Sequence, residues 1–285
     1  MNIYKILHFI KNLSLIKNLP ITSTGILYWL ICLYAFDQIS KLKILSIWYN
    51  PNFEYFLAKL ATFFPEYLPT LEYIWYFVQA DYVILTDHFQ FAKRSLVTRS
   101  AKLNLNDPIL SIPVQHPKNM LRIGDVVSIS DTHWRKKHFN TIYHQFHNEP
   151  FAYYYMPILK DLIYSDVQNL SDYVYNILLR LIDWLHFDTI IKQAVKIGYQ
   201  SENFDSILEW CRLTSSDTYL FTQQVFDNKW LNANDFKGSA IQLEPFPVLP
   251  EVHILDSNHH LSVLSFLFQY GPEAGYIIRQ YQNRK

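Results

Sequence analysis

The sequence predicts an α/β protein with a mixed, partly parallel sheet from the first half and a mainly helical second half. Two observations favour this class. Between residues 59 and 87 a strand, a proline-rich turn, a helix and a strand follow one another, which is the order of a parallel β-α-β unit. From residue 133 onward, helical spacing of apolar residues dominates. Half of the 285 residues are hydrophobic, so a sizeable core is within reach and one mixed domain is the simplest organisation.

Three short segments define the β-α-β unit. An apolar run in AKLATFFPEYLPTLEY ends at Pro65, and Pro65 and Pro69 bracket a turn. Residues 71–80 carry apolar side chains at helical spacing and are expected to form a helix. Residues 82–87, YVILTD, are a β-branched apolar run and are expected to form the next strand.

Two more strands and a long helical region are expected next. The strands are residues 109–115, ILSIPVQ, and 125–130, DVVSIS. Residues 133–150 show a helical stripe of aromatic and apolar side chains, with Thr132 as its N-cap and Pro150 at its end. Residues 151–185 are expected to be helical throughout, with Ser171 and Asp172 able to start the longer helix there.

The carboxy-terminal part of the chain carries shorter patterns. Residues 189–197 fit either a strand or a helix, and residues 201–213 fit a short helix capped by Ser201. Residues 241–248 are typical of an edge strand, because prolines end it. Residues 261–270 are predicted to be a final amphipathic helix, stopped by Gly271 and Pro272.

Residues 1–58 are treated as an amino-terminal extension and residues 59–285 as the main domain. The most apolar run of the extension, GILYWLICLYAF at residues 25–36, has 12 residues. A membrane span needs roughly 20, so this run is too short unless residues 21–47 are taken together across their charges. No small-residue cleavage site follows it. A helical extension packed on the domain, an interfacial helix pair that touches a membrane, and a segment that the function does not need all stay open.

Composition excludes several classes of function. Lysine plus arginine and aspartate plus glutamate number 25 each, so the net charge predicts no nucleic-acid partner. The two cysteines, Cys32 and Cys211, indicate a reducing, cytoplasmic setting, with any peripheral membrane contact confined to the extension. Cys211 lies on an apolar helical face and is assigned to the core rather than to a nucleophile. With six glycines and no glycine-rich phosphate loop, no cofactor is predicted.

The stretch TDHFQFAKRSLVTRS, residues 86–100, is the first candidate site. If residues 82–85 form a buried strand of a parallel sheet, ligands are expected at its carboxyl end, where Asp87 and Gln90 lie. Lys93 and Arg99 follow within reach and can hold a phosphate or a carboxylate. The alternative is a hydrated strand end, with Asp87 as a cap and the cations paired to surface acids.

The helix WRKKHFNTIYHQFH is the second candidate. His144 and His147 share one helix face, but no carboxylate completes a ligand set there, so no metal is predicted. His138 is the candidate for proton transfer, because a histidine titrates near neutral pH; a half-buried structural histidine is the alternative. A last polar segment, DTYLFTQQVF at residues 217–226, is interpreted as a loop that could line a cleft, with Thr218, Gln223 and Gln224 in it.

Taken together, several segments resemble the WbqC-like protein family. Residues 63–103 are similar to its opening: a Pro-Tyr-Leu-Pro type turn, a helix ending in Ala-Asp, a strand, and an Asp-x-x-Gln-x-x-Lys run followed by an arginine. ILSIPV, the Trp-x-x-x-His helix with its following Pro-Phe, TYLFTQQVFDNKWL and LSVLSFLFQYGPE resemble later blocks, to about residue 282. The residues that match the opening are Pro65, Tyr67, Leu68, Pro69, Ala80, Asp81, Asp87, Gln90, Lys93 and Arg99.

The chain also departs from the family pattern at three places. Thr98 stands where asparagine usually precedes the arginine, Gln224 and Val225 stand where a glycine pair is common, and Phe266 or its neighbour stands where an acid is usual. A ligand contact that depends on that glycine pair or that acid is not expected in this chain.

The resemblance implies a role in bacterial surface-polysaccharide biosynthesis, including O-antigen. We expect a transferase that acts on a phosphorylated or nucleotide-linked sugar. The rival hypothesis is a non-catalytic binding or assembly protein of the polysaccharide machinery, with aromatic side chains at partner surfaces and residues 1–58 docking it to a membrane complex. The expected site residues are Asp87 and His138 for proton transfer, and Tyr67, Gln90, Lys93, Arg99 and Trp134 for substrate binding.

Overall fold

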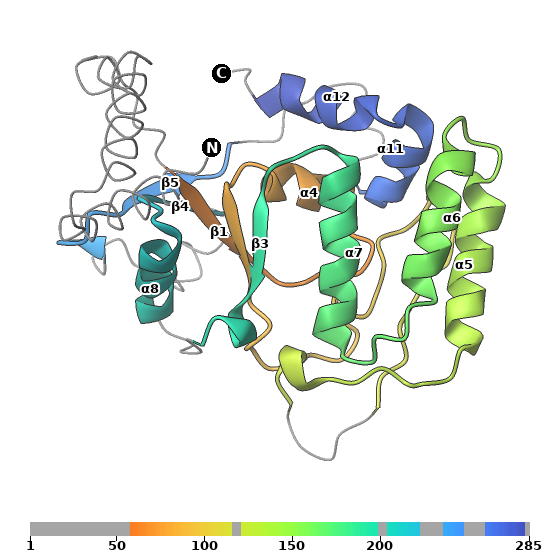
Figure 1. Ribbon diagram of the computed structural model, residues 1–285, viewed down its shortest axis with the longest axis horizontal. Helices are drawn as coiled ribbons and strands as arrows, with labels where there is room; N and C mark the ends of the chain where they lie inside the picture. The colour runs from red at the N-terminus through yellow and green to blue at the C-terminus, as the bar shows by residue number, and fades with distance from the viewer. Residues whose placement is uncertain (1–57, 116–120, 199–203, 223–235, 248–259, 283–285) are drawn as a thin grey trace, which may run out of the picture. The chain divides into compact units, whose positions relative to one another are not determined.

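The computed structural model describes residues 58–115, 121–198, 204–222, 236–247 and 260–282 (Figure 1). The predictions for the amino-terminal extension up to residue 57, and those for Ser201, Gln223 and Gln224, lie outside these ranges. None of the helices within them combines the length and the apolar character that crossing a membrane requires.

Within the described ranges, five parallel strands form one sheet in the order β3-β2-β1-β4-β5. The α/β class is therefore confirmed. Because β2 and β3 lie on one side of β1 and the later strands on the other, the strand order reverses between β1 and β4. Parallel sheets bind ligands outside the carboxyl ends of their strands at such a switch point. The strands are β1 (Lys59–Phe63), β2 (Tyr82–Leu85), β3 (Ile190–Gln193), β4 (Thr218–Phe221) and β5 (Gln242–Pro245).

Seven α-helices lie in the described part of the chain, most of them in its later half. Figure 1 shows α8 on one face of the sheet and α5, α6 and α7 on the other. The bounds are α4 (Leu71–Phe77), α5 (His133–Phe146), α6 (Ala152–Ile163), α7 (Leu170–Trp184), α8 (Phe204–Thr214), α11 (Val263–Tyr270) and α12 (Glu273–Gln282).

Successive strand residues feed two separate apolar layers. Ala61 and Val83 belong to the larger core, which also takes in α4 to α7, α11 and α12. Leu60 and Ile84, which are adjacent to Ala61 and Val83 on the same strands, belong to a smaller core with Trp210 of α8. This alternation follows from the two-residue period of a strand. The sheet is thus covered on both faces, which explains why β2 (YVIL) is a continuous apolar run.

The proline-bracketed turn leads from β1 into α4, as predicted. Thr70 caps the helix, because its hydroxyl accepts a hydrogen bond of 3.0 Å from the backbone of Tyr73. Leu68 has a φ of 45° and is fully buried. A non-glycine residue in this left-handed region costs about 1–2 kcal/mol, so the surrounding contacts must hold it there. The backbone N–H of Tyr67 donates to the carbonyl of Leu96 at 2.9 Å, which fixes the turn beside residue 96.

Two predicted strands do not join the sheet. Residues 109–115 and 125–130 form isolated bridges only, and Pro113 lacks the N–H that a continuous ladder needs. The short 3₁₀ helix η2 (Ile123–Asp125) also occupies the start of the second segment. These extended stretches instead pair with each other and with the loop that follows β2. The bridges pair Arg99 with Ser111 and Val114 with Ser128.

Other local predictions are confirmed or corrected. α5 matches the predicted helix, and β5 is an edge strand as expected. Residues 151–185 are not helical throughout, because the chain leaves helical geometry between Ile163 and Leu170, which separates α6 from α7. Asn169 caps the second by accepting from the backbone of Asp172, so Ser171 lies inside its first turn.

The carboxy-terminal predictions fare similarly. Residues 189–197 are β3 followed by the 3₁₀ helix η3 (Ala194–Lys196). The interpretation of Thr218 as part of a polar loop is wrong: it is buried at the start of β4, because residues 218–221 pair on both sides within the sheet. The helix after Leu261 is not the last one, since α12 follows the Gly271 turn.

Candidate functional site

Polar side chains gather at the edge of the sheet where β1, β2 and β3 end. β1 leads into the turn that carries Glu66 and Tyr67, Asp87 lies two residues beyond β2, and Gln193 is the last residue of β3. α5 and α7 both begin at this edge, at the lower side of Figure 1. The amino-terminal ends of helices carry partial positive charge, so the edge suits an anionic group.

Asp87 is fully buried and accepts hydrogen bonds from its own chain. Ser171 Oγ donates to Asp87 Oδ2 at 2.6 Å, Gln193 Nε2 lies 3.3 Å from the same oxygen, and the backbone N–H of Val195 donates to Oδ1 at 3.0 Å. The Asp87 carbonyl also accepts from the backbone of Gly124 at 2.7 Å. Asp87 therefore joins β2, α7, β3 and the loop around η2.

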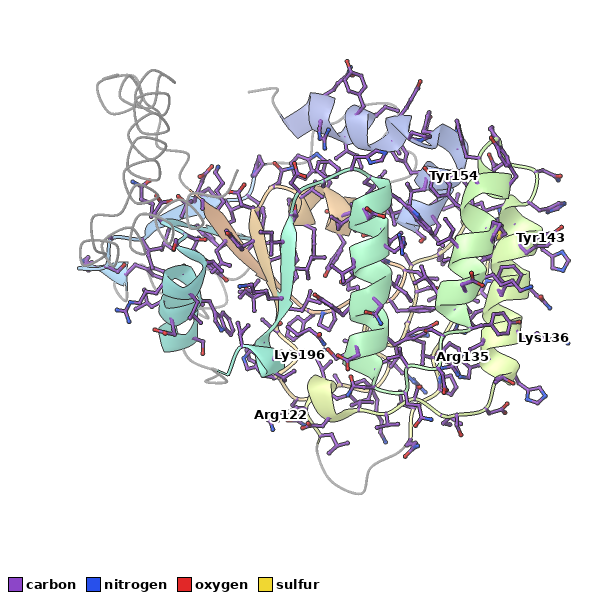
Figure 2. The ribbon with its side chains drawn as sticks, in the orientation of Figure 1. Arg122, Arg135, Lys136, Tyr143, Tyr154 and Lys196 are labelled. Atoms are coloured by element: carbon purple, nitrogen blue, oxygen red, sulfur yellow. The ribbon has the colours of Figure 1, made fainter. Side chains whose placement is uncertain are left out.

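This network continues toward solvent. Gln193 Nε2 also lies 2.9 Å from Asp172 Oδ1, and Lys196 Nζ lies 2.6 Å from that same oxygen. Burial raises the pKa of Asp172, but hydrogen bonds from Lys196 and Gln193 bring it below the ordinary value. In Figure 2, Lys196 and Arg122 both lie at this edge, so cationic side chains border it.

A second group of contacts joins the turn after β1 to helix α5. The hydroxyl of Tyr67 lies 2.9 Å from Nδ1 of His138, and both residues are buried. The Trp134 ring meets His138 edge-on at 5.1 Å between centroids, and its Nε1 donates to the carbonyl of Ile129. Three residues predicted to belong to one site, Tyr67, Trp134 and His138, are thus brought into contact.

Burial controls the charge of this group. It lowers the pKa of His138 from 6.5 to about 4, although a backbone hydrogen bond at Ser111 raises it in part. His138 is therefore neutral at pH 7. Burial also raises the pKa of Tyr67 well above 10, so its hydroxyl keeps its proton and can donate it to Nδ1. The pair is an uncharged hydrogen-bonded couple in the folded protein.

Arg135 is the one residue of this group that carries a positive charge. It is only 4% exposed, and its guanidinium carbon lies 4.4 Å from the Trp134 ring centre and 5.8 Å from that of Tyr173. In the part of the chain that the structure describes, Nε has no hydrogen-bond partner and no carboxylate forms an ion pair with this arginine. Burial raises the pKa of Tyr67 and Tyr173, and the Arg135 charge lowers both in part.

Glu66 precedes Tyr67 in the same turn and is half-buried. Burial, followed by repulsion from Glu72, raises its pKa from 4.5 to about 7. A carboxyl group that titrates near neutral pH beside a strand-order switch point is suited to proton transfer. Its charge state changes within the physiological range.

The remaining predicted residues lie outside these two clusters. Gln90 and Lys93 are exposed and Arg99 is half-buried. Gln90 pairs through its backbone with Arg122, and Arg99 with Ser111. Within the described ranges, no hydrogen bond or ion pair joins Lys93 or Arg99 to Asp87 or His138. They remain predictions, at more exposed positions of the loop that follows β2.

Two other kinds of site find little support. Cys211 is buried in the α8 layer, and burial raises the pKa of its thiol to about 12, so little thiolate exists at neutral pH. Its assignment to the core is confirmed. Among the described residues, no three or more histidine, cysteine, aspartate or glutamate side chains converge as metal ligands would.

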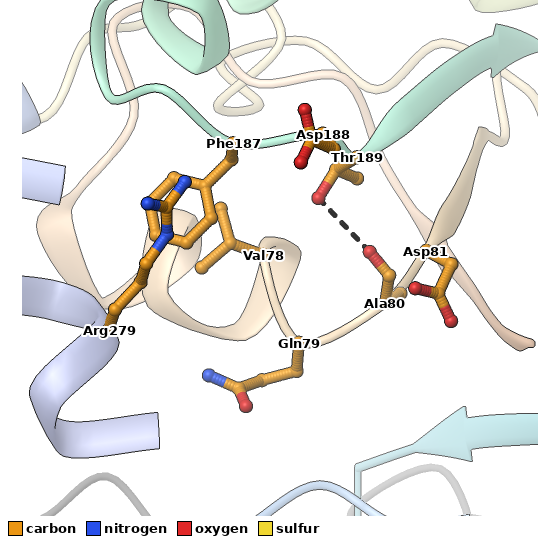
Figure 3. Close-up of a pocket in the computed structure, with 8 residues that line it drawn as sticks. All are labelled: Val78, Gln79, Ala80, Asp81, Phe187, Asp188, Thr189 and Arg279. Atoms are coloured by element: carbon orange, nitrogen blue, oxygen red, sulfur yellow. Dashed lines mark hydrogen bonds between the residues drawn. The ribbon is translucent and has the colours of Figure 1, made fainter. Parts of the chain in front are cut away.

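A hollow of about 300 Å³ lies at the opposite edge of the sheet (Figure 3). It is lined by residues that precede β2 and β3, including Asp81 and Thr189, and by Arg279 of α12. Its groups already have partners: Arg279 packs on the Phe187 ring at 4.9 Å and Thr189 donates to the carbonyl of Ala80. The carboxyl edge is the better candidate, because its polar groups are buried and follow the strands.

Sequence reasoning missed Arg135, Tyr173, Ser171, Gln193 and Glu66. One signal was available for Arg135. It lies three positions before His138, which places both on one helix face, whereas Lys136 and Lys137 point elsewhere and are exposed. No comparable signal marks Ser171 or Gln193, because their partner Asp87 is 84 and 106 positions away.

The fold and this edge define the class: a parallel α/β protein with a buried polar site outside the carboxyl ends of β1 and β2. The family comparison agrees with it. The chain belongs to the WbqC-like protein family, whose model matches residues 64–277. No curated protein and no solved structure matches the chain.

Proposed function

We propose that the chain is a transferase that acts on an activated sugar, either phosphorylated or nucleotide-linked, in surface-polysaccharide biosynthesis. One observation supports this most: polar residues gather outside the carboxyl ends of β1 and β2, beside the reversal of strand order between β1 and β4. That edge is where parallel α/β proteins bind phosphorylated and nucleotide ligands. Membership of the WbqC-like family agrees with a shared site but does not define the reaction.

In this proposal the substrate enters over the loop that follows β2. Lys93 and Arg99 hold phosphate or carboxylate charge, and Gln90 orients a hydroxyl or amide group. Accessible cations of this kind attract an anionic ligand and fix its orientation. Tyr67 and Trp134 supply an aromatic wall and a hydroxyl deeper in the site.

Proton transfer is assigned to the Tyr67–His138 pair. His138 is neutral at pH 7 because burial lowers its pKa to about 4, so Nδ1 can accept a proton through the Tyr67 hydroxyl 2.9 Å away. An anionic substrate beside the pair would raise the pKa of His138 and make it a stronger base. Asp87 was predicted to handle a proton; its three donors support instead a positioning role for the first turn of α7.

Ligand binding by the full chain tests this proposal. We expect nucleotide-sugars or sugar phosphates to raise the melting temperature, and we expect Lys93→Ala and Arg99→Ala each to weaken that binding by about tenfold. Arg180→Ala removes an exposed cation on α7 and serves as the control, because it pairs with Asp183 away from the edge. If both loop variants fold and bind as the parent does, the proposed anion contacts are wrong.

A non-catalytic binding or assembly role is favoured by a different surface. A groove of about 330 Å³ lies on the outer face of α5 and α6, and Tyr153 beside it is 79% exposed. Figure 2 shows Tyr143 on this outer side. Exposed aromatic side chains are common in protein interfaces. The groove is lined by Phe139, Tyr143, Tyr153, Met156, Pro157 and Lys160.

The two functions predict different effects of one variant, Tyr153→Ser. Tyr153→Ser should leave ligand binding and transfer unchanged if the chain is a transferase. It should reduce association with the polysaccharide machinery if assembly is the main role. Release of nucleotide or phosphate from a bound donor, tested with a range of acceptors, decides whether a group is transferred.

A further inference from the structure

Arg135 presents an electrostatic imbalance inside the protein. A buried cation is normally paired with a carboxylate and hydrogen-bonded through its N–H groups. Here the side chain is 4% exposed, Nε has no hydrogen-bond partner, and no ion pair involves this arginine within the residues the structure describes. Arginine keeps its charge in proteins, so it cannot relieve the imbalance by losing a proton.

The carboxylates of the neighbouring elements are already engaged. Asp87 accepts from Ser171, Gln193 and a backbone N–H, and Asp172 is paired with Lys196 at 2.6 Å. Asp131, at the start of α5, is bound to His133. Each of these three carboxylates therefore already has a partner other than Arg135.

The groups that contact Arg135 are aromatic rings, which leave its positive charge without a counter-ion. The rings of Trp134 and Tyr173 stabilise a cation by their faces, but this contribution is smaller than the cost of burying an unpaired charge. The Tyr67 hydroxyl and His138 lie next to the same two rings. None of these groups is negative, so the local charge stays positive.

We propose that Arg135 is an interior binding site for an oxyanion of the ligand, a phosphate or a carboxylate, with Trp134 and Tyr173 as its walls. The planar guanidinium binds two oxygens of such a group at once. Arg135 is the third residue of α5, so the positive end of that helix points to the same place. This inference deepens the proposed function. It depends on that function only for the assumption that the substrate binds at the carboxyl edge of the sheet.

The test compares two neighbouring cations of α5. Figure 2 shows Arg135 on the inner side of the helix and Lys136 on its outer side. We expect inorganic phosphate, a sugar 1-phosphate or a sugar carboxylate to raise the melting temperature of the parent, beyond sodium chloride at equal ionic strength. Arg135→Met should lose this rise and weaken binding at least about tenfold. Lys136→Met should keep it.

Two further observations sharpen the result. Without ligand, Arg135→Met should melt at the same temperature as the parent or higher, because it removes an unpaired buried charge. If that variant fails to fold, the Arg135 Nε–H resonance of the parent, assigned by its absence in Arg135→Lys, should shift on phosphate addition. The proposal is overturned if none of the three anions stabilises the parent, if Arg135→Met retains the rise, or if the resonance does not move.

This experiment separates the inference from the proposed function, because it measures binding without turnover. Anion binding at Arg135 with no transfer to any acceptor would end the transferase proposal alone. Transfer that proceeds unchanged in Arg135→Met would end the Arg135 inference alone. A response to phosphate but not to the sugar carboxylate would identify the phosphate as the natural group.

Discussion

The hydroxyl of Tyr67 lies 2.9 Å from Nδ1 of His138, and this contact ties the turn after β1 to helix α5 across 71 positions of sequence. Both partners are buried, so neither can exchange the lost bond for water if the other is removed. The backbone N–H of Tyr67 in the same turn donates to the carbonyl of Leu96, which holds the turn in place.

Tyr67→Phe should therefore destabilise the fold by about 1–3 kcal/mol, the cost of a buried nitrogen left without its partner. Urea unfolding at pH 7 measures this. Tyr143→Phe is the control, because Tyr143 lies on the same helix, α5, but on its solvent-exposed side, where it is 45% exposed. Equal effects of the two variants would show that the Tyr67–His138 bond contributes nothing to stability.

Asp87→Asn should also destabilise the protein, by about 3 kcal/mol. The substitution removes a charge that accepts from Ser171, Gln193 and Val195, and it turns one acceptor into a donor that faces other donors. The free energy of unfolding is the measurement. Asp183→Asn, at a side chain that is 67% exposed, should change it by no more than about 0.5 kcal/mol. A similar small change for Asp87→Asn would contradict the positioning role.

The raised pKa of Glu66 makes stability fall as pH rises. Its folded-state pKa is about 7 against an ordinary 4.5, so the folded state holds the proton more tightly than the unfolded state. This contribution is complete below pH 4.5 and is lost by pH 7. Glu66→Gln should gain stability relative to the parent across that range, by at most about 3 kcal/mol.

Unfolding curves of parent and Glu66→Gln at intervals between pH 4 and 8 check this expectation. Glu273→Gln, at an exposed position in the first turn of α12, is the matched control. A difference between parent and Glu66→Gln that is independent of pH would mean that Glu66 titrates as an ordinary surface acid.

His138 acts in the opposite direction. Its folded-state pKa of about 4 lies below the ordinary 6.5, so the unfolded state binds the proton more readily. The stability that this contributes is complete above pH 6.5 and is lost as the pH falls toward 4. His138→Gln should flatten the acid side of the stability curve. Unfolding of the parent and of His138→Gln at pH 5 and pH 7 checks this. If both proteins lose the same free energy of unfolding between pH 7 and pH 5, His138 is not a buried neutral histidine.

Gly275→Ala should disrupt the packing of α12 on the end of α7. An added Cβ would lie 1.8 Å from the carbonyl oxygen of Leu185, and backbone cannot move aside as a side chain can. We expect a loss of about 3 kcal/mol, measured by thermal or urea unfolding. Tyr276→Ala on the same helix, where the side chain is 63% exposed, should have a much smaller effect. An unchanged free energy of unfolding for Gly275→Ala would show that α12 does not pack closely against Leu185 at this position.

Local patterns predicted much of the fold. The β-α-β unit, the α5 helix and the β5 edge strand follow from apolar spacing, prolines and caps within a few residues of each other. The errors came where a local pattern allowed two outcomes. ILSIPVQ is as apolar as a sheet strand, but it forms isolated bridges, and TYLF was taken for loop although it pairs on both sides as β4.

The candidate site divides in the same way. Tyr67, Trp134 and His138 were predicted for one site and do meet, because the turn after β1 packs against α5. Arg135 could have been added from its place three residues before His138. Ser171 and Gln193 could not, since their link to Asp87 depends on how distant strands and helices pack.

The sequence by itself determined the β-α-β unit, the α5 helix, the β5 edge strand and the family that the chain resembles, since these depend on neighbours along the chain. Only the tertiary structure decided the strand order, the burial of Arg135 without an acid partner, and the enclosure of Asp87 by Ser171 and Gln193. The physical reason is that periodicity specifies a buried face but not the element that covers it. Whether a buried charge such as that of Arg135 finds a partner therefore depends on which element packs over it.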